Sequence, residues 1–305
     1  MRAVQIRSYG GPEVLSVNDV DFAATPGPGQ VLVDVAAAGV NPVDWKIREG
    51  YMKDLMPLEF PVTLGNEIAG TVAALGEGVT EFAVGDEVFG NTGPVGAFTD
   101  KVIVPAAQLA AKPAALSPAQ AAALPVAIVT TQAAFDLGEV GPGTRILIHA
   151  AAGGVGTVAI QMARALGAHV TALTSPSSMD FVRALGADEV VDRTTAYDNS
   201  IGGFDFVFDG FGPEAQERSW PLLKEGGILV TLVAPPDEEK AKAHKVRAAM
   251  AFGAPNGAVL QAACALVEQG KLKPHVQSTY RVEKAGDAMA EVQAGKVRGK
   301  VVLTF

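Results

Sequence analysis

Residues 146–170 read ILIHAAAGGVGTVAIQMARALGAHV, and most of what the sequence says about the fold follows from them. We expect an apolar strand at 145–149, a glycine turn, an amphipathic helix at 155–166 and a second strand at 169–174. Glycines in such a turn let helix and strand approach closely, and the free amides and dipole of the helix N-terminus attract phosphate. The stretch therefore predicts a dinucleotide-binding site.

The spacing of this motif is A-x-x-G-x-x-G, with Ala150 where the usual fingerprint has its first glycine. We assign the phosphate contacts to the turn and the first helical turn, at Ala152, Gly153, Gly154, Val155 and Gly156. The strand and helix on either side make the assignment more specific than the glycines alone.

Strands and helices continue to alternate after this motif. We expect further strands at 189–192, 204–209, 227–233 and 246–252, with helices at 179–185 and 213–223. Alternation of this kind specifies a parallel, doubly wound sheet, a Rossmann-type domain, which we place at 118–254. Ser117 before Pro118 is a helix start signal.

The two ends of the chain read differently. Residues 1–117 contain short β segments separated by Gly and Pro turns, and after about residue 256 we expect one helix and a final strand at 300–305. Such a terminal strand often returns to a β domain, so we group 255–305 with 1–117. The fold class is α/β, with the Rossmann sheet inserted in a β-rich domain.

Composition narrows the function classes. Hydrophobic residues make up 49% and charged residues 19%, which indicates a packed globular protein rather than a disordered one. The formal net charge of -9 disfavours nucleic acid as a partner. The N-terminal residues do not read as a signal peptide, and Pro125 and Gln132 interrupt the most apolar stretch, so we expect a cytoplasmic protein without a membrane segment.

Several blocks along the chain resemble one family. They are HAAAGGVG at 149–156, GVNPVDWKIREGY at 39–51, GNEIAGTVAALGEGVTEFAVGDEVFG at 65–90, GAFTDKVIVPA at 96–106, AAALPVAIVTTQAAF at 121–135 and GKVVL at 299–303. Together they are similar, in the same order, to the zinc-free quinone oxidoreductase branch, zeta-crystallin-like, of the medium-chain dehydrogenase/reductase superfamily. The resemblance implies a GroES-like domain around the Rossmann domain, a homodimer, and reduction of a small quinone or α,β-unsaturated carbonyl compound.

Zinc-dependent members of that superfamily bind catalytic zinc through a Cys, the His of a G-H-E motif and a further ligand. This sequence has Asn41 in the region of the first Cys and Asn66 in place of the His. The single cysteine, Cys264, lies far along the chain in a helical apolar pattern. Because catalytic zinc needs three good protein ligands, we predict that no metal is bound.

Without a Lewis acid, hydrogen-bond donors must polarise the acceptor carbonyl. The resemblance implies that Asn41 and Tyr51 face the nicotinamide, and we predict both as catalytic groups, with the Tyr51 phenol as the better donor. Lys46 matches a lysine that reaches toward the cofactor in enone-reducing relatives. Asp44 is expected to support this segment.

The residues after the second Rossmann strand set the choice of cofactor. An NAD enzyme usually has an acid there, whereas this chain has Thr174, Ser175, Pro176, Ser177 and Ser178. Arg193, after the third strand, is positioned to pair with a 2′-phosphate. We therefore predict NADPH, bound through Ser175, Ser178 and Arg193, with further cofactor contacts at Asn41, Lys46, Thr130, Val233 and Phe252.

Two alternatives stay open. An enoyl thioester reductase would share the chemistry but would need a basic entrance for a phosphopantetheine or CoA phosphate. A crystallin-like protein would bind NADPH without turnover, and the presence of Asn41 and Tyr51 favours turnover.

Overall fold

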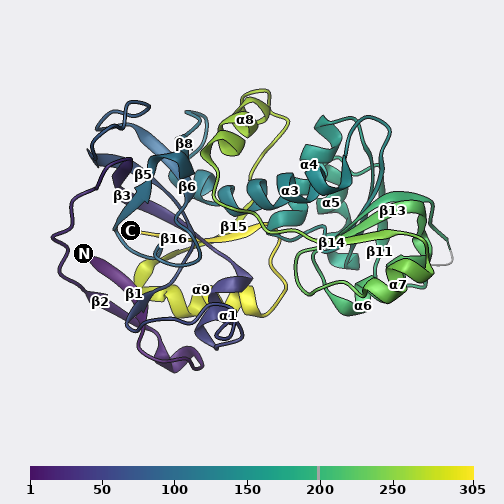
Figure 1. The fold of residues 1–305 in the computed structure, drawn as a ribbon, viewed down its shortest axis with the longest axis horizontal. Helices are drawn as coiled ribbons and strands as arrows, with labels where there is room; N and C mark the ends of the chain where they lie inside the picture. The colour runs from purple at the N-terminus through teal and green to yellow at the C-terminus, as the bar shows by residue number, and fades with distance from the viewer. Residues whose placement is uncertain (198–199) are drawn as a thin grey trace. The chain divides into compact units, whose positions relative to one another are not determined.

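The computed structural model describes residues 1–197 and 200–305 and forms two compact units. Unit 1 combines three segments, Met1–Val126, Pro255–Glu268 and Pro274–Phe305; unit 2 comprises Ala127–Ala254 and Gln269–Lys273. Both ends of the chain thus contribute to one unit (Figure 1). We keep the domain boundaries at 117 and 254 as a proposal.

Unit 1 is built on a seven-stranded sheet. Its order is β15 (Val276–Arg281), β16 (Lys300–Thr304), β3 (Gln30–Val40), β5 (Glu67–Leu75), β6 (Glu87–Asn91) and β8 (Leu109–Ala111), with β7 (Lys101–Pro105) also paired to β3. A smaller sheet has the order β2 (Ser16–Asp19), β1 (Arg2–Ile6) and β4 (Val62–Thr63). The antiparallel pairing of β16 with β3 confirms the expectation that the terminal strand joins the N-terminal β segments.

Buried aliphatic side chains from both sheets fill the core of unit 1, with Phe98 completely buried among them. Two helices, α1 (Pro42–Arg48) and α9 (Ala285–Gln293), pack against each other, and α9 also packs on β15 and β16. Arg48 is buried at this contact, where its guanidinium donates to Gly10 O (3.3 Å) and Gln293 Oε1 (3.4 Å). These contacts connect α1 to the C-terminal part of the chain.

Unit 2 is the predicted doubly wound sheet. Its six strands are all parallel, in the order β11 (Glu189–Asp192), β10 (His169–Thr174), β9 (Arg145–Ile148), β12 (Phe204–Asp209), β13 (Leu223–Thr231) and β14 (Arg247–Met250). Figure 1 shows α4 (Gly154–Ala165) and α5 (Met179–Ala184) on one face, and α6 (Pro213–Ser219) and α7 (Glu238–Ala243) on the other. The strand order reverses direction beside β9, which is where dinucleotides bind in this architecture.

Four elements depart from the sequence expectations. The predicted helix at 213–223 ends at Ser219, because Pro221 has no N–H to donate and Trp220–Leu222 continues as a 3-10 turn. The expected strands at 227–233 and 246–252 are β13, which begins at Leu223, and the shorter β14. The tail holds two helices, α8 (Gly257–Glu268) and α9, where one was expected, with β15 between them.

The apolar stretch that begins at Ser117 forms α2 (Pro118–Ala122) and α3 (Pro125–Gly138). The Ser117 Oγ accepts a hydrogen bond from Gln120 N at 3.3 Å, which confirms the predicted helix start. Among the described residues, Pro118–Gly138 is the one helical segment with the length and apolarity of a membrane span, yet 61% of its apolar window is buried inside the protein. That burial fits a core helix.

Aromatic packing attaches α3 to the sheet of unit 2. The Phe135 ring lies edge-on to Phe206 (5.9 Å between centroids) and Phe208 (6.1 Å), and all three rings are buried. Gly138 allows this contact, since a Cβ there would lie 2.1 Å from the Phe206 ring.

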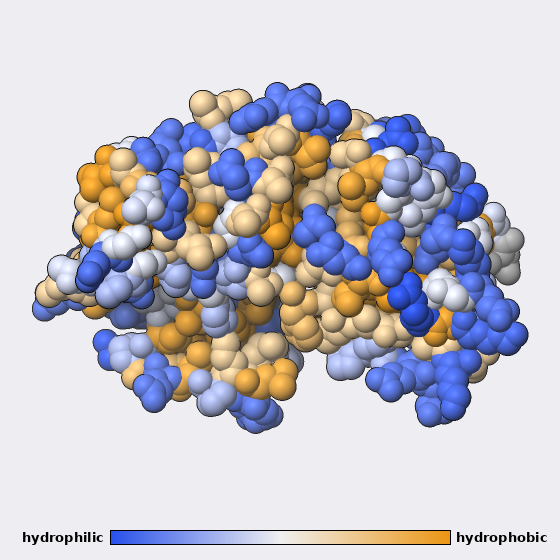
Figure 2. Space-filling view, turned by 45° about the horizontal axis from the view of Figure 1, so that its top comes forward, coloured by the Kyte–Doolittle hydropathy of each residue, from blue (hydrophilic) through white to orange (hydrophobic). Residues whose placement is uncertain are grey.

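On the face shown in Figure 2, hydrophilic residues are interspersed with the hydrophobic ones.

We expect Phe135→Ala to lower the free energy of unfolding by about 3 to 5 kcal/mol, because it leaves a cavity against two aromatic rings. Leu137→Ala is the matched control on the same helix: this side chain is 40% exposed, and its loss should change stability by roughly 0.5 kcal/mol. Urea unfolding followed by circular dichroism measures both. Equal losses in the two variants would contradict the assignment of Phe135 to the core.

Candidate active site

The start of α4 presents free backbone amides at the carboxyl edge of the unit 2 sheet. Gly153 precedes the helix, and Thr157 N is the first amide to bond back along it, to Gly153 O at 2.9 Å. The amides of residues 154–156 therefore have no helical carbonyl to bond, and Ala152 to Val155 are partly exposed. This arrangement suits a phosphate group.

Close packing of this turn explains its glycine and its alanine. A Cβ on Gly156 would lie 2.4 Å from Ala150 O and 2.8 Å from Ala151 Cα, so only glycine lets the helix approach the strand. Ala150 has a φ of 50°, the left-handed conformation that glycine usually occupies at the first fingerprint position. The backbone thus follows the usual dinucleotide turn although the side chain differs.

The structure brings Ser175 and Arg193 together in unit 2. Thr174 and Asp192 are paired in the parallel register of β10 and β11, so the next residue of each strand lies at the same edge of the sheet. Arg193 N donates to Thr174 O (2.9 Å), and the exposed guanidinium lies 4.9 Å from the centroid of the Phe211 ring. Ser178 is buried, and its Oγ lies 3.5 Å from that of Ser175.

Two further predicted cofactor residues, Val233 and Phe252, lie beyond strand ends of unit 2, and a third, Thr130, lies on α3. Thr231 pairs with Met250 in register, so Val233 and Phe252 follow β13 and β14 at the same edge, where they are 37% and 73% exposed. Thr130, on α3, packs against Gly253: a Cβ on this glycine would lie 2.6 Å from the Thr130 Oγ1. Carboxyl edges of parallel sheets are where such ligands bind.

In unit 1, the predicted catalytic segment forms a short helix that sequence reasoning missed. Pro42 occupies the first turn of α1, Asn41 precedes it, and Asp44 Oδ2 accepts from Asn41 N at 2.6 Å. The N-P-x-D pattern of cap, proline and acid was the available signal. The structure places Asn41 and Tyr51 beyond opposite ends of α1, so their backbone positions do not bring them together.

The aromatic side chains near Tyr51 are packed around α1. The Tyr51 ring lies edge-on to Trp45 at 5.9 Å between centroids, and Tyr51 is 70% exposed. The Lys46 Nζ lies 5.8 Å from the centroid of Trp45. The exposed Tyr51 side chain is available to a ligand.

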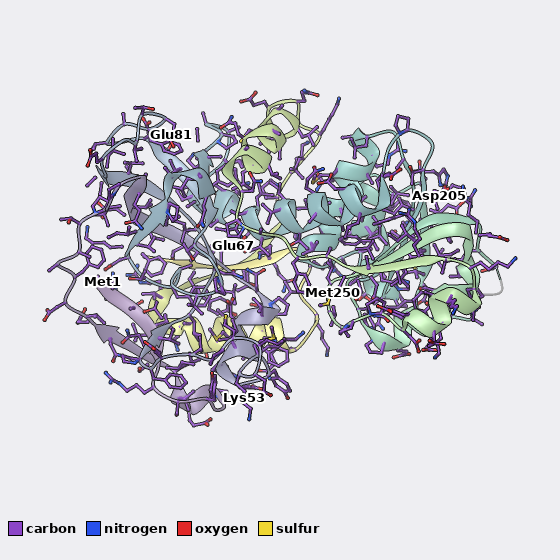
Figure 3. The ribbon with its side chains drawn as sticks, in the orientation of Figure 1. Met1, Lys53, Glu67, Glu81, Asp205 and Met250 are labelled. Atoms are coloured by element: carbon purple, nitrogen blue, oxygen red, sulfur yellow. The ribbon has the colours of Figure 1, made fainter. Side chains whose placement is uncertain are left out.

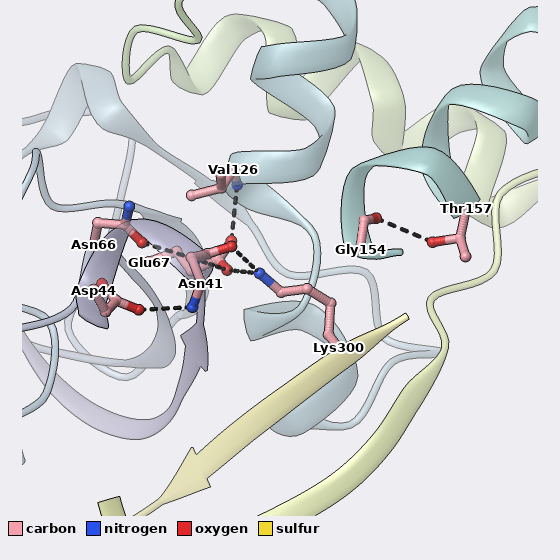
Figure 4. Close-up of polar contacts among 8 residues, drawn as sticks. All are labelled: Asn41, Asp44, Asn66, Glu67, Val126, Gly154, Thr157 and Lys300. Atoms are coloured by element: carbon pink, nitrogen blue, oxygen red, sulfur yellow. Dashed lines mark hydrogen bonds and ion pairs between the residues drawn. The ribbon is translucent and has the colours of Figure 1, made fainter. Parts of the chain in front are cut away.

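A buried polar cluster occupies the other end of α1; it consists of Asn41, Asn66, Glu67 and Lys300, and Figure 4 shows its bonds. Glu67 Oε1 accepts from Lys300 Nζ and from Asn41 Nδ2 (2.7 Å), while Glu67 Oε2 accepts from Val126 N (2.8 Å) at the start of α3. Asn41 Nδ2 also donates to Asn66 Oδ1 at 2.9 Å. Figure 3 shows Glu67 inside its unit.

Every polar atom of the Asn41 amide is engaged in this cluster. Its Nδ2 donates to two oxygens, and its Oδ1 accepts from Lys300 Nζ at 2.5 Å. An acceptor carbonyl would receive a hydrogen bond from Asn41 only after one of these bonds broke. The role of Asn41 as a donor to the acceptor therefore stays a prediction. In this arrangement the amide links Asn66, Glu67 and Lys300 by hydrogen bonds.

Glu67 and Lys300 are site residues that sequence reasoning did not single out. Both stand inside quoted blocks, Glu67 in GNEIAG and Lys300 in GKVVL, separated by 233 positions. Nothing in the local pattern of either block indicates the pairing. The contact depends on β16 meeting β3, two strands from opposite ends of the chain.

Two family models and several curated proteins match the sequence of this chain. The model of the alcohol dehydrogenase GroES-like domain matches residues 27–114, and that of a zinc-binding dehydrogenase matches residues 185–303. A mitochondrial NAD(P)H oxidoreductase of Mus musculus is 34% identical over 99% of this chain and 89% of its own. A chloroplastic quinone-oxidoreductase homolog of Spinacia oleracea is 32% identical over 99% and 98%.

Solved structures agree. The Escherichia coli quinone oxidoreductase complexed with NADPH has a TM-score of 0.90 and 26% identity, with complete coverage of both chains. The chain belongs to the quinone oxidoreductase branch of the medium-chain dehydrogenase/reductase superfamily. The CurK enoyl reductase has the same fold, with a TM-score of 0.90, 28% identity and coverage of 99% and 98%. Membership confirms the predicted fold class and a general oxidoreductase role that uses a nicotinamide cofactor.

The comparisons overturn one expectation. The sequence led us to expect a cytoplasmic protein, whereas the relatives from mouse and spinach are mitochondrial and chloroplastic proteins and point to organelles. The error came from treating the N-terminal residues as informative about location, when the fold of this branch is shared by proteins of different compartments.

The zinc implied by one matching family model does not fit the side chains of the cluster. Amides replace the ligands expected at Asn41 and Asn66, and the Glu67 carboxylate is already bound by an ammonium group and two N–H donors. Across residues 1–197 and 200–305, no three His, Cys, Asp or Glu side chains are grouped for a metal ion. Zinc prefers thiolate, imidazole and free carboxylate ligands.

Asp44 is a buried carboxyl beside this cluster. Burial raises its pKa to about 7, although the hydrogen bond from Asn41 N and the charge of Lys300 act in the opposite direction. Its Oδ1 has no hydrogen-bond partner among the described residues. Because the folded protein binds this proton more tightly than the unfolded chain, the stabilisation it contributes is present at low pH and is lost as pH rises from about 4 to about 7.

Asp44→Asn should remove this pH dependence, because an amide does not titrate. We expect the stability of the wild type relative to the variant to fall by roughly 1 to 3 kcal/mol between pH 5 and pH 8. Urea unfolding of both proteins at the two pH values measures it. A difference between them that does not change with pH would contradict the raised pKa.

Proposed function

We propose that this chain is a zinc-independent, NADPH-dependent enzyme that transfers a hydride to a small quinone or α,β-unsaturated carbonyl compound. The observation that carries the proposal is the carboxyl edge of the unit 2 sheet: the free amides of residues 154–156 follow β9 there, and Ser175 and Arg193 directly follow β10 and β11. Free amides for a pyrophosphate and a cationic side chain for a 2′-phosphate are the groups that we expect a binding site for NADPH to provide. NADPH, when bound, supplies the hydride.

The preference for NADPH rests on charge. Residues 174–178 contain no carboxylate that would repel a 2′-phosphate, and Arg193, which is exposed, follows β11 at the same edge of the sheet. Hydrogen bonds between ionised groups are about twice as strong as neutral ones. The phosphate of NADPH, which NADH lacks, therefore gains contacts at this edge.

Arg193→Ala should reduce the preference for NADPH over NADH by roughly 10-fold to 100-fold, the loss of one charge-assisted contact. Arg164→Ala is the control, because this arginine is also partly exposed in unit 2 but pairs with Asp188 at the opposite end of α4. Dissociation constants of the two cofactors, measured by fluorescence titration, decide the matter. Equal preference in the wild type and in Arg193→Ala would contradict the assignment.

In unit 1 we assign hydrogen bonding of the acceptor oxygen to Tyr51. The phenol is exposed and oriented by its contact with Trp45, so it can donate to an oxygen on which negative charge develops. Delocalised products such as an enolate or a hydroquinone need less stabilisation than an isolated alkoxide. This difference favours conjugated acceptors for a site without zinc.

Tyr51→Phe should lower the single-turnover rate by at most about 2.7 to 4 kcal/mol in activation free energy, and less if water replaces the phenol. NADPH affinity should change little, because the lost bond belongs to the transition state. Tyr280→Phe is the matched control, since its hydroxyl already donates to Glu291 on α9. Unchanged rates in Tyr51→Phe would place the acceptor elsewhere.

A survey of NADPH oxidation with quinones, enones and enoyl thioesters tests the proposed function as a whole. Turnover with quinones or free enones supports it, and exclusive use of thioesters would favour the enoyl reductase chemistry named for CurK. NADPH binding without oxidation would indicate a crystallin-like binding protein. We also propose a homodimer that pairs β14, the edge strand of unit 2, across a two-fold axis.

A further inference from the structure

Like Arg48 and Lys112, Lys300 is a basic residue of unit 1 whose side chain is almost completely enclosed. Its side chain is 6% exposed, and that of Glu67 is fully buried. A buried ammonium is costly unless it is paired, and here Glu67 Oε1 and Asn41 Oδ1 compensate for the lost water. The site thus holds a fixed positive charge at one end of α1.

The pairing leaves part of the ammonium unused. A lysine ammonium has three N–H donors, and among the described residues only two acceptors, Glu67 Oε1 and Asn41 Oδ1, bond Lys300. The remaining N–H belongs to a charged group, so a hydrogen bond that it donates is stronger than one from a neutral donor. Asn41 and Lys300 each keep 5% of their surface exposed, so the cluster is nearly but not completely closed.

The neighbouring groups fix this ammonium in place. Glu67 also bonds Val126 N at the start of α3, and Asn41 is bonded to Asn66, so each partner of Lys300 has a second anchor. A donor that does not reorganise during the reaction is the most effective kind for stabilising developing charge. By contrast, the Asn41 amide has no N–H left to give.

From these contacts we propose that Lys300 is a catalytic residue. Its third N–H donates a hydrogen bond to the acceptor oxygen on which negative charge develops, a bond that Asn41 cannot donate because both of its N–H groups are engaged. The inference rests on the proposed function, because it needs a hydride acceptor. No proton leaves Lys300 in this step; the hydrogen bond strengthens as charge builds on oxygen. The acceptor is thus a compound whose reduction product is an oxyanion, as with enones and quinones.

The test compares the wild type with Glu67→Gln/Lys300→Met. Removing Lys300 alone would leave a buried carboxylate without its partner, and Glu67→Gln alone would leave a buried ammonium, whereas the double variant buries no unpaired charge. With saturating NADPH, we expect the single-turnover rate of the double variant to be about 10²-fold to 10³-fold below that of the wild type. The loss should be larger for acceptors whose product oxyanion is more basic.

Lys112→Met is the matched control. This lysine is also buried in unit 1, with a 4% exposed side chain paired to Glu87, and it donates to Leu116 O at 2.6 Å. Its loss should leave the single-turnover rate of the folded protein unchanged. Thermal unfolding of all variants verifies that the rates compare folded enzymes.

Two results would overturn the inference by itself. One is equal single-turnover rates in the wild type and the double variant; the other is weaker NADPH binding in the double variant with an unchanged rate at saturation, which would make Lys300 a cofactor contact only. If none of the quinones, enones or enoyl thioesters tested supports NADPH oxidation by the wild-type protein, the proposed function is overturned, and this inference with it.

Discussion

The buried ion pair between Glu67 and Lys300 connects the elements of unit 1 that carry its buried polar side chains. It joins β5 and β16, includes Asn41 before α1, and reaches the first turn of α3 through Val126 N. Burying such a pair costs less when further hydrogen bonds satisfy its other polar groups, and the partners that Glu67 finds in Asn41 and Val126 N restrict the geometry of the elements that contribute them. The arrangement of α1 beside the sheet depends on that restriction.

The side chains of the cluster do not suit a metal ion, although one matching family model is that of a zinc-binding dehydrogenase. Amides at positions 41 and 66 carry no charge, so they suit an ammonium group and not a divalent cation. The positive charge comes from a side chain of the chain itself, on β16. The proposed function favours delocalised acceptors, because one cationic donor and one phenol, the roles proposed for Lys300 and Tyr51, provide less stabilisation than a Lewis acid.

Much of the fold could be predicted from local sequence. The strand and glycine pattern of 146–170 gave β9, α4 and β10 nearly to the residue, because period and turn chemistry agree there. The tail was harder: β15 is half-buried, with alternating partly buried and exposed residues, and its pairing partner β16 lies beyond α9. The site was only partly predictable, since Asn41 and Tyr51 belong to one recognisable block, whereas Glu67 and Lys300 meet through strand pairing across the whole chain.

The central claim is hydride transfer from a nicotinamide cofactor to a conjugated acceptor, and an isotope measurement tests it most directly. Wild-type protein would be incubated with an enone and NADPH deuterated at the transferring C4 position, and the product examined by NMR and mass spectrometry. The account predicts one deuterium bonded to the β carbon of the saturated product, with stoichiometric oxidation of the cofactor. A product that carries deuterium only on the former carbonyl carbon, or no labelled product at all, would contradict it.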